Sequence, residues 1–150
     1  MERETITFGA SVTRTGITLR APVWTVAPMV TQSDAAFRLL TRRHGARLVY
    51  SEMLMADEFA ADPSYRQTGL GLQGGCVPEA DHPLIVQFAA NDPEVLLRAA
   101  LAAQECGADA VDINLGHGER SRSQLAVQEI VSAVLAGQFI RLYLVLKKDF

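Results

Sequence analysis

Cysteine is scarce in this chain, and metal-binding patterns are lacking. The 150 residues include two cysteines, Cys76 and Cys106, and no C-x-x-C motif, which argues against a disulfide framework and favours a reducing compartment. His44, His82 and His117 stand at no metal-ligand spacing with one another or with the cysteines. The sequence therefore predicts no metal site, and Cys106, on the apolar face of an expected helix, is interpreted as inert core.

Long apolar runs and an excess of positive charge are lacking as well. The apolar stretch 130–146 is interrupted by Ser132, Gly137, Gln138 and Arg141, which argues against a membrane span. The charged N-terminus, Met-Glu-Arg-Glu-Thr, argues against a signal peptide. A net charge of −3 gives no overall attraction to nucleic acid. We therefore expect a cytoplasmic protein with no membrane segment.

The composition is that of one ordinary globular domain. Apolar residues make up 49% of the 150 residues and charged residues 21%, both usual values for a soluble domain. One local feature departs from the acidic balance, a basic cluster in and after an expected helix. It could form a nucleic-acid patch or a solvated helix face, and the solvated face is favoured. The cluster comprises Arg38, Arg42, Arg43, His44 and Arg47.

Strands and helices are expected to alternate along the middle of the chain. Short β-rich runs occur near residues 23–27, 47–51, 83–89 and 109–115, and helical patterns lie between them. Alternation of this kind indicates a parallel sheet with right-handed crossovers. The predicted fold class is therefore α/β.

Capping and stop residues predict where the helices begin and end. Ser33 is the predicted N-cap of a helix that ends before Gly45, and residues 91–94 open a later helix. A short helix is expected at 53–61, followed by a loop. That loop contains a G-x-G-x-x-G run at 69–74, which we reject as a nucleotide site because no strand precedes it and no helix follows it.

Two of the expected strands turn a polar side chain inward near their carboxyl ends. Side chains alternate along a strand, which places Gln87 of one strand and Asn114 of the next on the inner face, with Asp112 beside Asn114. Parallel barrels build their active sites at this place. A buried amide needs partners, which are either neighbouring loops or a heterocyclic ligand. The residues alone leave both alternatives open.

Five short motifs follow one another along these elements. They are Val26-Ala27-Pro28-Met29-Val30, Phe37-Arg38-Leu39-Leu40, Tyr50-Ser51-Glu52-Met53, Pro83 to Ala89 followed by Asn91-Asp92-Pro93, and Asp112-Ile113-Asn114-Leu115-Gly116. In this order and spacing, across residues 22–116, the chain resembles the dihydrouridine synthases, FMN-dependent enzymes that reduce uridines in tRNA.

The resemblance implies the N-terminal part of an FMN-binding TIM (β/α)8 barrel. Pro28, Met29 and Val30 are expected along the flavin, Gln87 on its isoalloxazine ring, and Asn114 beside flavin and uracil. In the family, reduced FMN donates hydride to uracil C6, a cysteine protonates C5, and NADPH restores the flavin. The expected cofactors are therefore FMN and NADPH, and the expected partner is tRNA.

Residues 117–150 depart from the family. His117 stands at the position of the family's cysteine, so no catalytic residue is assigned. Lys147 is a candidate for a lysine that contacts the flavin. We interpret 1–21 as a hairpin extension, 22–116 as the family-like half barrel, and 117–150 as a divergent helix–strand tail.

The length of the chain leaves two hypotheses of different classes. A complete barrel takes about 250 residues, so an incomplete barrel with exposed strand edges is expected. The first hypothesis is a truncated, impaired tRNA-dihydrouridine synthase, and Asp-Ile-Asn-Leu-Gly favours it over another FMN barrel oxidoreductase. The alternative is a non-catalytic half-barrel that self-associates or binds a partner through its open sheet edges.

Overall fold

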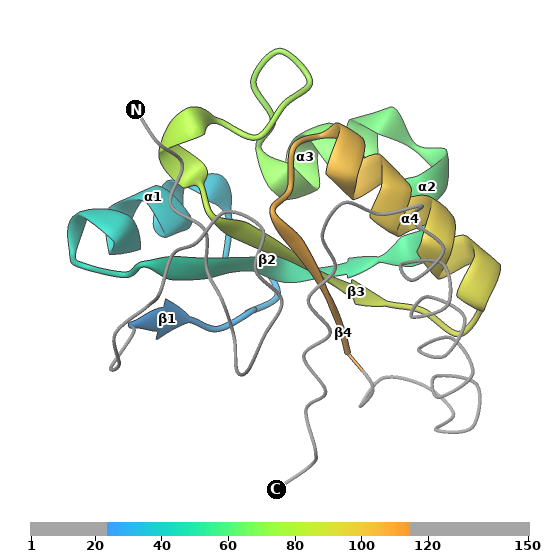
Figure 1. Cartoon of the computed structure of the whole chain (residues 1–150), viewed down its shortest axis with the longest axis horizontal. Helices are drawn as coiled ribbons and strands as arrows, with labels where there is room; N and C mark the ends of the chain where they lie inside the picture. The colour runs from blue at the N-terminus through green and yellow to red at the C-terminus, as the bar shows by residue number, and fades with distance from the viewer. Residues whose placement is uncertain (1–23, 115–150) are drawn as a thin grey trace, which may run out of the picture.

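The computed structural model describes residues 24–114, which form a four-stranded parallel sheet with its helices packed on one face (Figure 1). The strands are β1 (Thr25–Val26), β2 (Leu48–Met55), β3 (Leu84–Ala89) and β4 (Ala110–Ile113). The α-helices are α1 (Ala35–Arg43), α2 (Ala56–Ala61), α3 (Pro63–Leu70) and α4 (Pro93–Glu105), and a 3-10 helix, η1 (Glu79–Asp81), precedes β3.

The strands lie in the sheet in their order along the chain. The order is β1-β2-β3-β4, and each neighbouring pair is parallel. A doubly wound sheet reverses its order at a switch point, whereas a TIM barrel places each strand beside its predecessor and its helices outside. The described part of the chain follows the barrel arrangement throughout. The predicted fold class, an α/β N-terminal part of a TIM barrel, is confirmed.

The two faces of the sheet bury different sets of side chains. The larger cluster joins the helices to one face and includes Val49, Val86, Val111 and Cys106. Burial raises the pKa of the Cys106 thiol, in agreement with its interpretation as inert core. A smaller cluster with no helix residue lies on the other face, which corresponds to the interior of a barrel. Its members are Leu48, Tyr50, Ile85 and Ala110.

The first helix begins at a different cap from the one predicted. Asp34 is the N-cap of α1, and its carboxylate accepts a hydrogen bond from the backbone N–H of Phe37 at 2.7 Å. The prediction of Ser33 was wrong, because the Ser33 hydroxyl binds the loop before it instead. Gly45, at a φ of 98°, follows the helix end as expected.

Residues 53–82 are more regular than predicted. Strand β2 continues to Met55, so the helix expected from residue 53 begins only at Ala56. Helix α3 occupies part of the expected loop, because Asp62 caps its first turn and a proline follows. The G-x-G-x-x-G run lies at the end of α3, where Gly71 adopts a φ of 60°. The run therefore follows a helix rather than a strand, which agrees with its rejection as a nucleotide site.

The solvated-face interpretation of the basic cluster was wrong for two of its residues. Arg38 is fully buried, and its Nε and Nη2 donate to Oδ2 of Asp81 at 2.9 and 2.8 Å. Arg42 is half-buried and donates to the backbone carbonyls of Asp81 and Pro83. A guanidinium removed from water needs a counter-charge and acceptors, and residues distant in sequence provide them. The remaining members, Arg43, His44 and Arg47, are exposed.

Several predictions lie outside the described residues. They are the hairpin at 1–21, the tail at 117–150 with His117 and Lys147, and the interrupted apolar stretch at 130–146. The proposed division of the chain therefore stays a prediction. Within residues 24–114, every helix is too short or too polar to cross a bilayer.

Candidate functional site

A bulge in β2 determines which side chains face the interior near the carboxyl ends of the strands. Tyr50 pairs with Ile85 and Met53 with Gln87, so residues 51–52 together oppose a single residue of β3. An extra residue in one strand shifts its alternation by one position. Met53 therefore shares the inner face with Gln87, where regular alternation after Tyr50 would have turned it toward the helices.

Gln87 lies in the middle of this inner face and is held at two points. The residue is 3% exposed, and its Nε2 donates to Oδ2 of Asp112 on the paired strand at 2.5 Å. Its backbone N–H donates to Oγ of Ser51 in the bulge at 3.1 Å. The prediction that Gln87 turns inward is confirmed.

Asn114 follows β4 at the next level toward the carboxyl ends. Its backbone N–H donates to the carbonyl oxygen of Phe88 at 2.9 Å, and its side-chain Nδ2 lies 3.1 Å from the sulfur of Met53. Since Met53 is paired with Gln87, both predicted amides converge on the same patch of the inner face. The residues Met53, Gln87, Asp112 and Asn114 are called the inner polar patch below.

The loop after β1 carries Pro28, Met29 and Val30 and is fixed by two side chains. Ser33 Oγ accepts from the Met29 N–H at 3.1 Å and donates to the carbonyl of Ala27 at 3.0 Å. Glu52, from the β2 bulge, accepts from the N–H of Thr31 at 2.8 Å, where the backbone has a positive φ of 63°. Two of the three predicted contact residues are half-exposed, and Val30 is 55% exposed. The loop is thus held against the bulge, and its exposed apolar side chains leave a surface on which a ligand can pack.

Sequence reasoning missed the roles of Ser51, Glu52 and Asp112. The sequence placed Ser51 and Glu52 in a family-like motif and Asp112 in another motif and on the inner face, but it assigned none of them a hydrogen-bond partner. A serine and a glutamate inside an otherwise apolar strand were the available signal, because such groups need partners when a sheet is covered on both faces. Those partners are the Gln87 N–H for Ser51 and the loop N–H for Glu52.

Tyr50 lies one level below the inner polar patch and contributes a neutral phenol. Burial, and secondly the charge of Asp112, raise the pKa of Tyr50 to about 12. Its hydroxyl therefore remains protonated at neutral pH. Groups of His, Cys, Asp and Glu that could hold a metal ion do not occur among residues 24–114.

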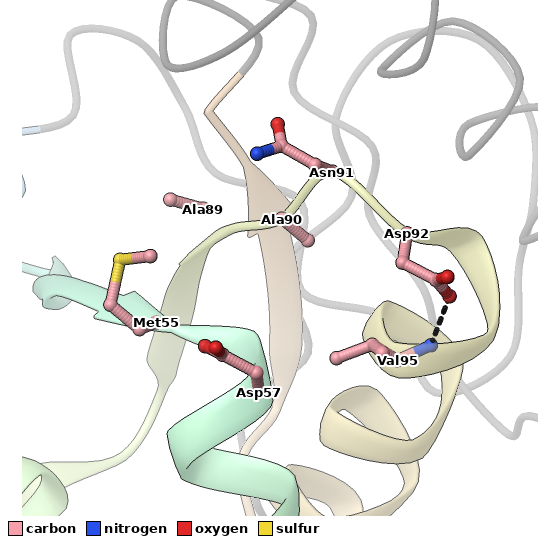
Figure 2. Close-up of a pocket in the computed structure, with 7 residues that line it drawn as sticks. All are labelled: Met55, Asp57, Ala89, Ala90, Asn91, Asp92 and Val95. Atoms are coloured by element: carbon pink, nitrogen blue, oxygen red, sulfur yellow. Dashed lines mark hydrogen bonds between the residues drawn. The ribbon is translucent and has the colours of Figure 1, made fainter.

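A cavity of about 230 Å³ lies at the carboxyl ends of β2 and β3, beside the N-terminus of α4 (Figure 2). Asp57 lines it from α2, and Asp92 lines it from the start of α4, where the Asp92 carboxylate accepts from the N–H of Val95 at 2.9 Å. The cavity contains none of the five predicted flavin contacts. Two carboxylates also oppose an anionic ligand, so this cavity is not the predicted flavin surface.

Comparisons with known proteins agree with the geometry. Residues 25–117, which include all four strands, match the family model described as dihydrouridine synthase (Dus). The chain is 57% identical over 91 residues to the tRNA-dihydrouridine(16/17) synthase (NAD(P)(+))-like protein of Rattus norvegicus, covering 61% of this chain and 20% of that protein. It is 53% identical over 97 residues to the tRNA-dihydrouridine(16/17) synthase (NAD(P)(+)) of Saccharomyces cerevisiae, and this match covers 63% of this chain and 22% of that protein.

A bacterial relative matches over a longer segment. The chain is 34% identical over 121 residues to tRNA-dihydrouridine synthase B of Pseudomonas aeruginosa, covering 73% of this chain and 35% of that protein. The chain therefore spans between 20% and 35% of the length of these three relatives.

Proposed function

This chain belongs to the dihydrouridine synthase family, and from that premise we propose that it serves the FMN-dependent reduction of uridine to dihydrouridine in tRNA. The relatives from yeast and Pseudomonas aeruginosa are named tRNA-dihydrouridine synthases, and the rat relative is named as a protein like one. In this chain, the observation that carries the proposal is the nearly buried, inward-facing amide of Gln87, which is fixed by Asp112 near the carboxyl ends of the strands. That is the end at which a parallel barrel binds its ligands.

The predicted contact residues suit the ring of a flavin better than its phosphate. Pro28, Met29 and Val30 offer an apolar surface on a fixed loop, against which a planar ring can pack. Gln87 and Asn114 offer polar groups for the edge of that ring. None of these five side chains carries a positive charge for a phosphate. We therefore expect binding through the ring, with modest affinity.

The chemistry is divided between the cofactor and the chain's own residues. When bound, reduced FMN supplies the hydride that reduces the uracil ring, with NADPH as the proposed source of electrons and the cytoplasm as the proposed location. The inner polar patch would orient the ring, and the loop of Pro28 to Val30 would offer it an apolar surface. His117, at the family's cysteine position, could donate a proton as an imidazolium. An imidazole is larger than a thiol, and such a replacement need not preserve the geometry of proton donation, so we assign His117 no catalytic role.

The test is a flavin fluorescence titration of the full 150-residue chain. We expect weak, measurable FMN binding, and Gln87→Leu weakens it by about tenfold or more, because one well-placed hydrogen bond changes affinity by that order. Gln73→Leu, at an exposed glutamine outside the patch, is the matched control and leaves affinity within about twofold. Absence of binding at millimolar FMN refutes the flavin assignment, and equal binding by Gln87→Leu refutes the role of this residue.

Self-association is the second candidate, and two features of the sheet favour it. In the described part of the chain β1 and β4 are the edge strands, and Trp24, next to β1, is 73% exposed. Unpaired strand edges and exposed aromatic residues promote association between chains. Sedimentation velocity at several concentrations distinguishes the candidates. A stable dimer that binds no FMN favours the association role, whereas a monomer that binds FMN favours the enzyme role.

A further inference from the structure

The carboxylate of Asp112 determines which end of the Gln87 amide is available to a ligand. Asp112 is 2% exposed and pairs directly with Gln87 across β3 and β4. An ionised carboxylate only accepts hydrogen bonds, whereas an amide donates through nitrogen and accepts through oxygen. The amide therefore turns Nε2 toward Asp112, at 2.5 Å, and Oε1 away from it.

The carbonyl end of the amide has a different environment. Within residues 24–114, the Gln87 side chain forms its hydrogen bond through Nε2, to Asp112, and the bond to Ser51 Oγ comes from the backbone N–H, so neither of these bonds uses Oε1. Although the residue is only 3% exposed, Oε1 is not among the enclosed side-chain atoms that lack a partner in this part of the chain, so it is open to a donor that a ligand brings. The ligand that best fits this position presents an N–H group.

We propose that Asp112 is a positioning residue for ligand choice, because it holds the Gln87 amide with Oε1 toward the ligand. The inner polar patch then selects a heterocycle with an N–H at this edge, such as N3–H of an isoalloxazine ring, over a ring that offers only an acceptor. The identity of that ring rests on the proposed function. The orientation of the amide rests on the β3–β4 contact alone.

The first experiment compares FMN with 3-methyl-FMN, which lacks the N3–H donor. The full-length wild-type chain binds FMN about tenfold more tightly than the methylated flavin, as expected for the loss of one hydrogen bond. In Asp112→Asn the preference falls to about twofold or less, because an asparagine can meet Gln87 with either end of its own amide. Asp109→Asn, a carboxylate that accepts from Leu84 N–H and contacts His82 instead, is the matched control and retains the preference.

The second experiment needs no flavin and reads the amide directly. In the unliganded chain, the side-chain NH2 signals of Gln87 in a ¹⁵N–¹H correlation spectrum are assigned by their loss in Gln87→Met. We expect these signals to shift in Asp112→Asn and to stay in place in Asp109→Asn. Signals that do not respond to Asp112→Asn overturn the inference even if FMN binds.

The two experiments separate failure of the inference from failure of the proposed function. Responsive signals with no flavin binding refute the proposed function and, with it, the ligand part of the inference. Normal FMN binding with an unchanged preference in Asp112→Asn refutes the inference alone. A shifted signal together with a lost preference supports both.

Discussion

Two buried polar clusters lie on opposite faces of the same sheet, and their hydrogen bonds are satisfied to different degrees. On the helical side, Arg38 donates to Asp81 and to the backbone carbonyls of Ser33 and Leu70, at 2.8 to 2.9 Å. On the inner side, Gln87 uses its donor end on Asp112 and keeps its acceptor end open among the described residues. The first cluster is complete without a ligand, whereas the second is not.

The two clusters therefore differ in their expected roles: the first stabilises the fold, and the second is the proposed ligand site. The Arg38 cluster connects α1 with the end of α3 and with η1, which leads into β3, so it fixes helices that are distant in sequence. Fully satisfied polar networks specify and rigidify a fold. A polar group left with unused capacity in a buried place is expected at a binding site, where local rules are broken for function. The comparison is therefore between a structural ion pair and an amide that we propose as a ligand contact.

Removing Asp81 should have the largest effect on stability. In Asp81→Ala the Arg38 guanidinium, fully buried in the wild type, loses its counter-charge, and breaking a buried pair in this way costs about 3–5 kcal/mol. Urea unfolding of the full chain measures this loss in the free energy of unfolding. The control Asp109→Ala removes a carboxylate whose side chain is 23% exposed, and the expected loss is about 1 kcal/mol. Equal losses in the two variants would contradict a special role for the Arg38–Asp81 pair.

The sequence could predict the sheet and its inward amides, because both depend on local signals. Alternation with period two marked Gln87 and Asn114, and the strand–helix alternation predicted the parallel order. The sequence could not predict the pairing of Arg38, because its partner Asp81 is 43 residues away. A local pattern assigns an arginine of this kind to solvent. The bulge at 51–52 was also inaccessible, because a bulge is defined only by the register of the partner strand.

Tyr50 should have an effect of intermediate size on stability. This effect depends on pH and measures how well the inner face shields the phenol from water. Its pKa is raised to about 12 from the ordinary value of 10.0 for a tyrosine. The unfolded chain therefore releases the phenolic proton first, and the contribution of this group to stability is complete below pH 10 and lost as the pH rises toward 12. The free energy of unfolding falls by at most about 1.4 kcal/mol per pH unit through this group.

The measurement is urea unfolding of wild type and Tyr50→Phe at pH 8, 10 and 11. Other groups titrate in this range as well. The contribution of Tyr50 is therefore the difference between the two proteins in how their free energy of unfolding changes with pH. The wild type should lose more stability than Tyr50→Phe between pH 10 and 11. Parallel curves would mean that Tyr50 is as accessible to water in the folded chain as in the unfolded one.

Replacing both partners of the inner pair should change stability least and ligand binding most. In Gln87→Leu/Asp112→Leu, apolar side chains replace the amide and the carboxylate together, and such paired replacements are often near neutral, within about 1 kcal/mol. In contrast, Arg38→Met/Asp81→Leu leaves the buried carbonyls of Ser33 and Leu70 without the donors that Arg38 supplies, so it should remain destabilised by about 2–4 kcal/mol. Urea unfolding of the two double variants, with FMN titration of the first, measures the contrast. If the inner pair is a ligand site, its removal abolishes flavin binding from a chain that still folds. A large loss of stability in the inner double variant would instead make the Gln87–Asp112 pair a second structural cluster, and the distinction between the two faces would fail.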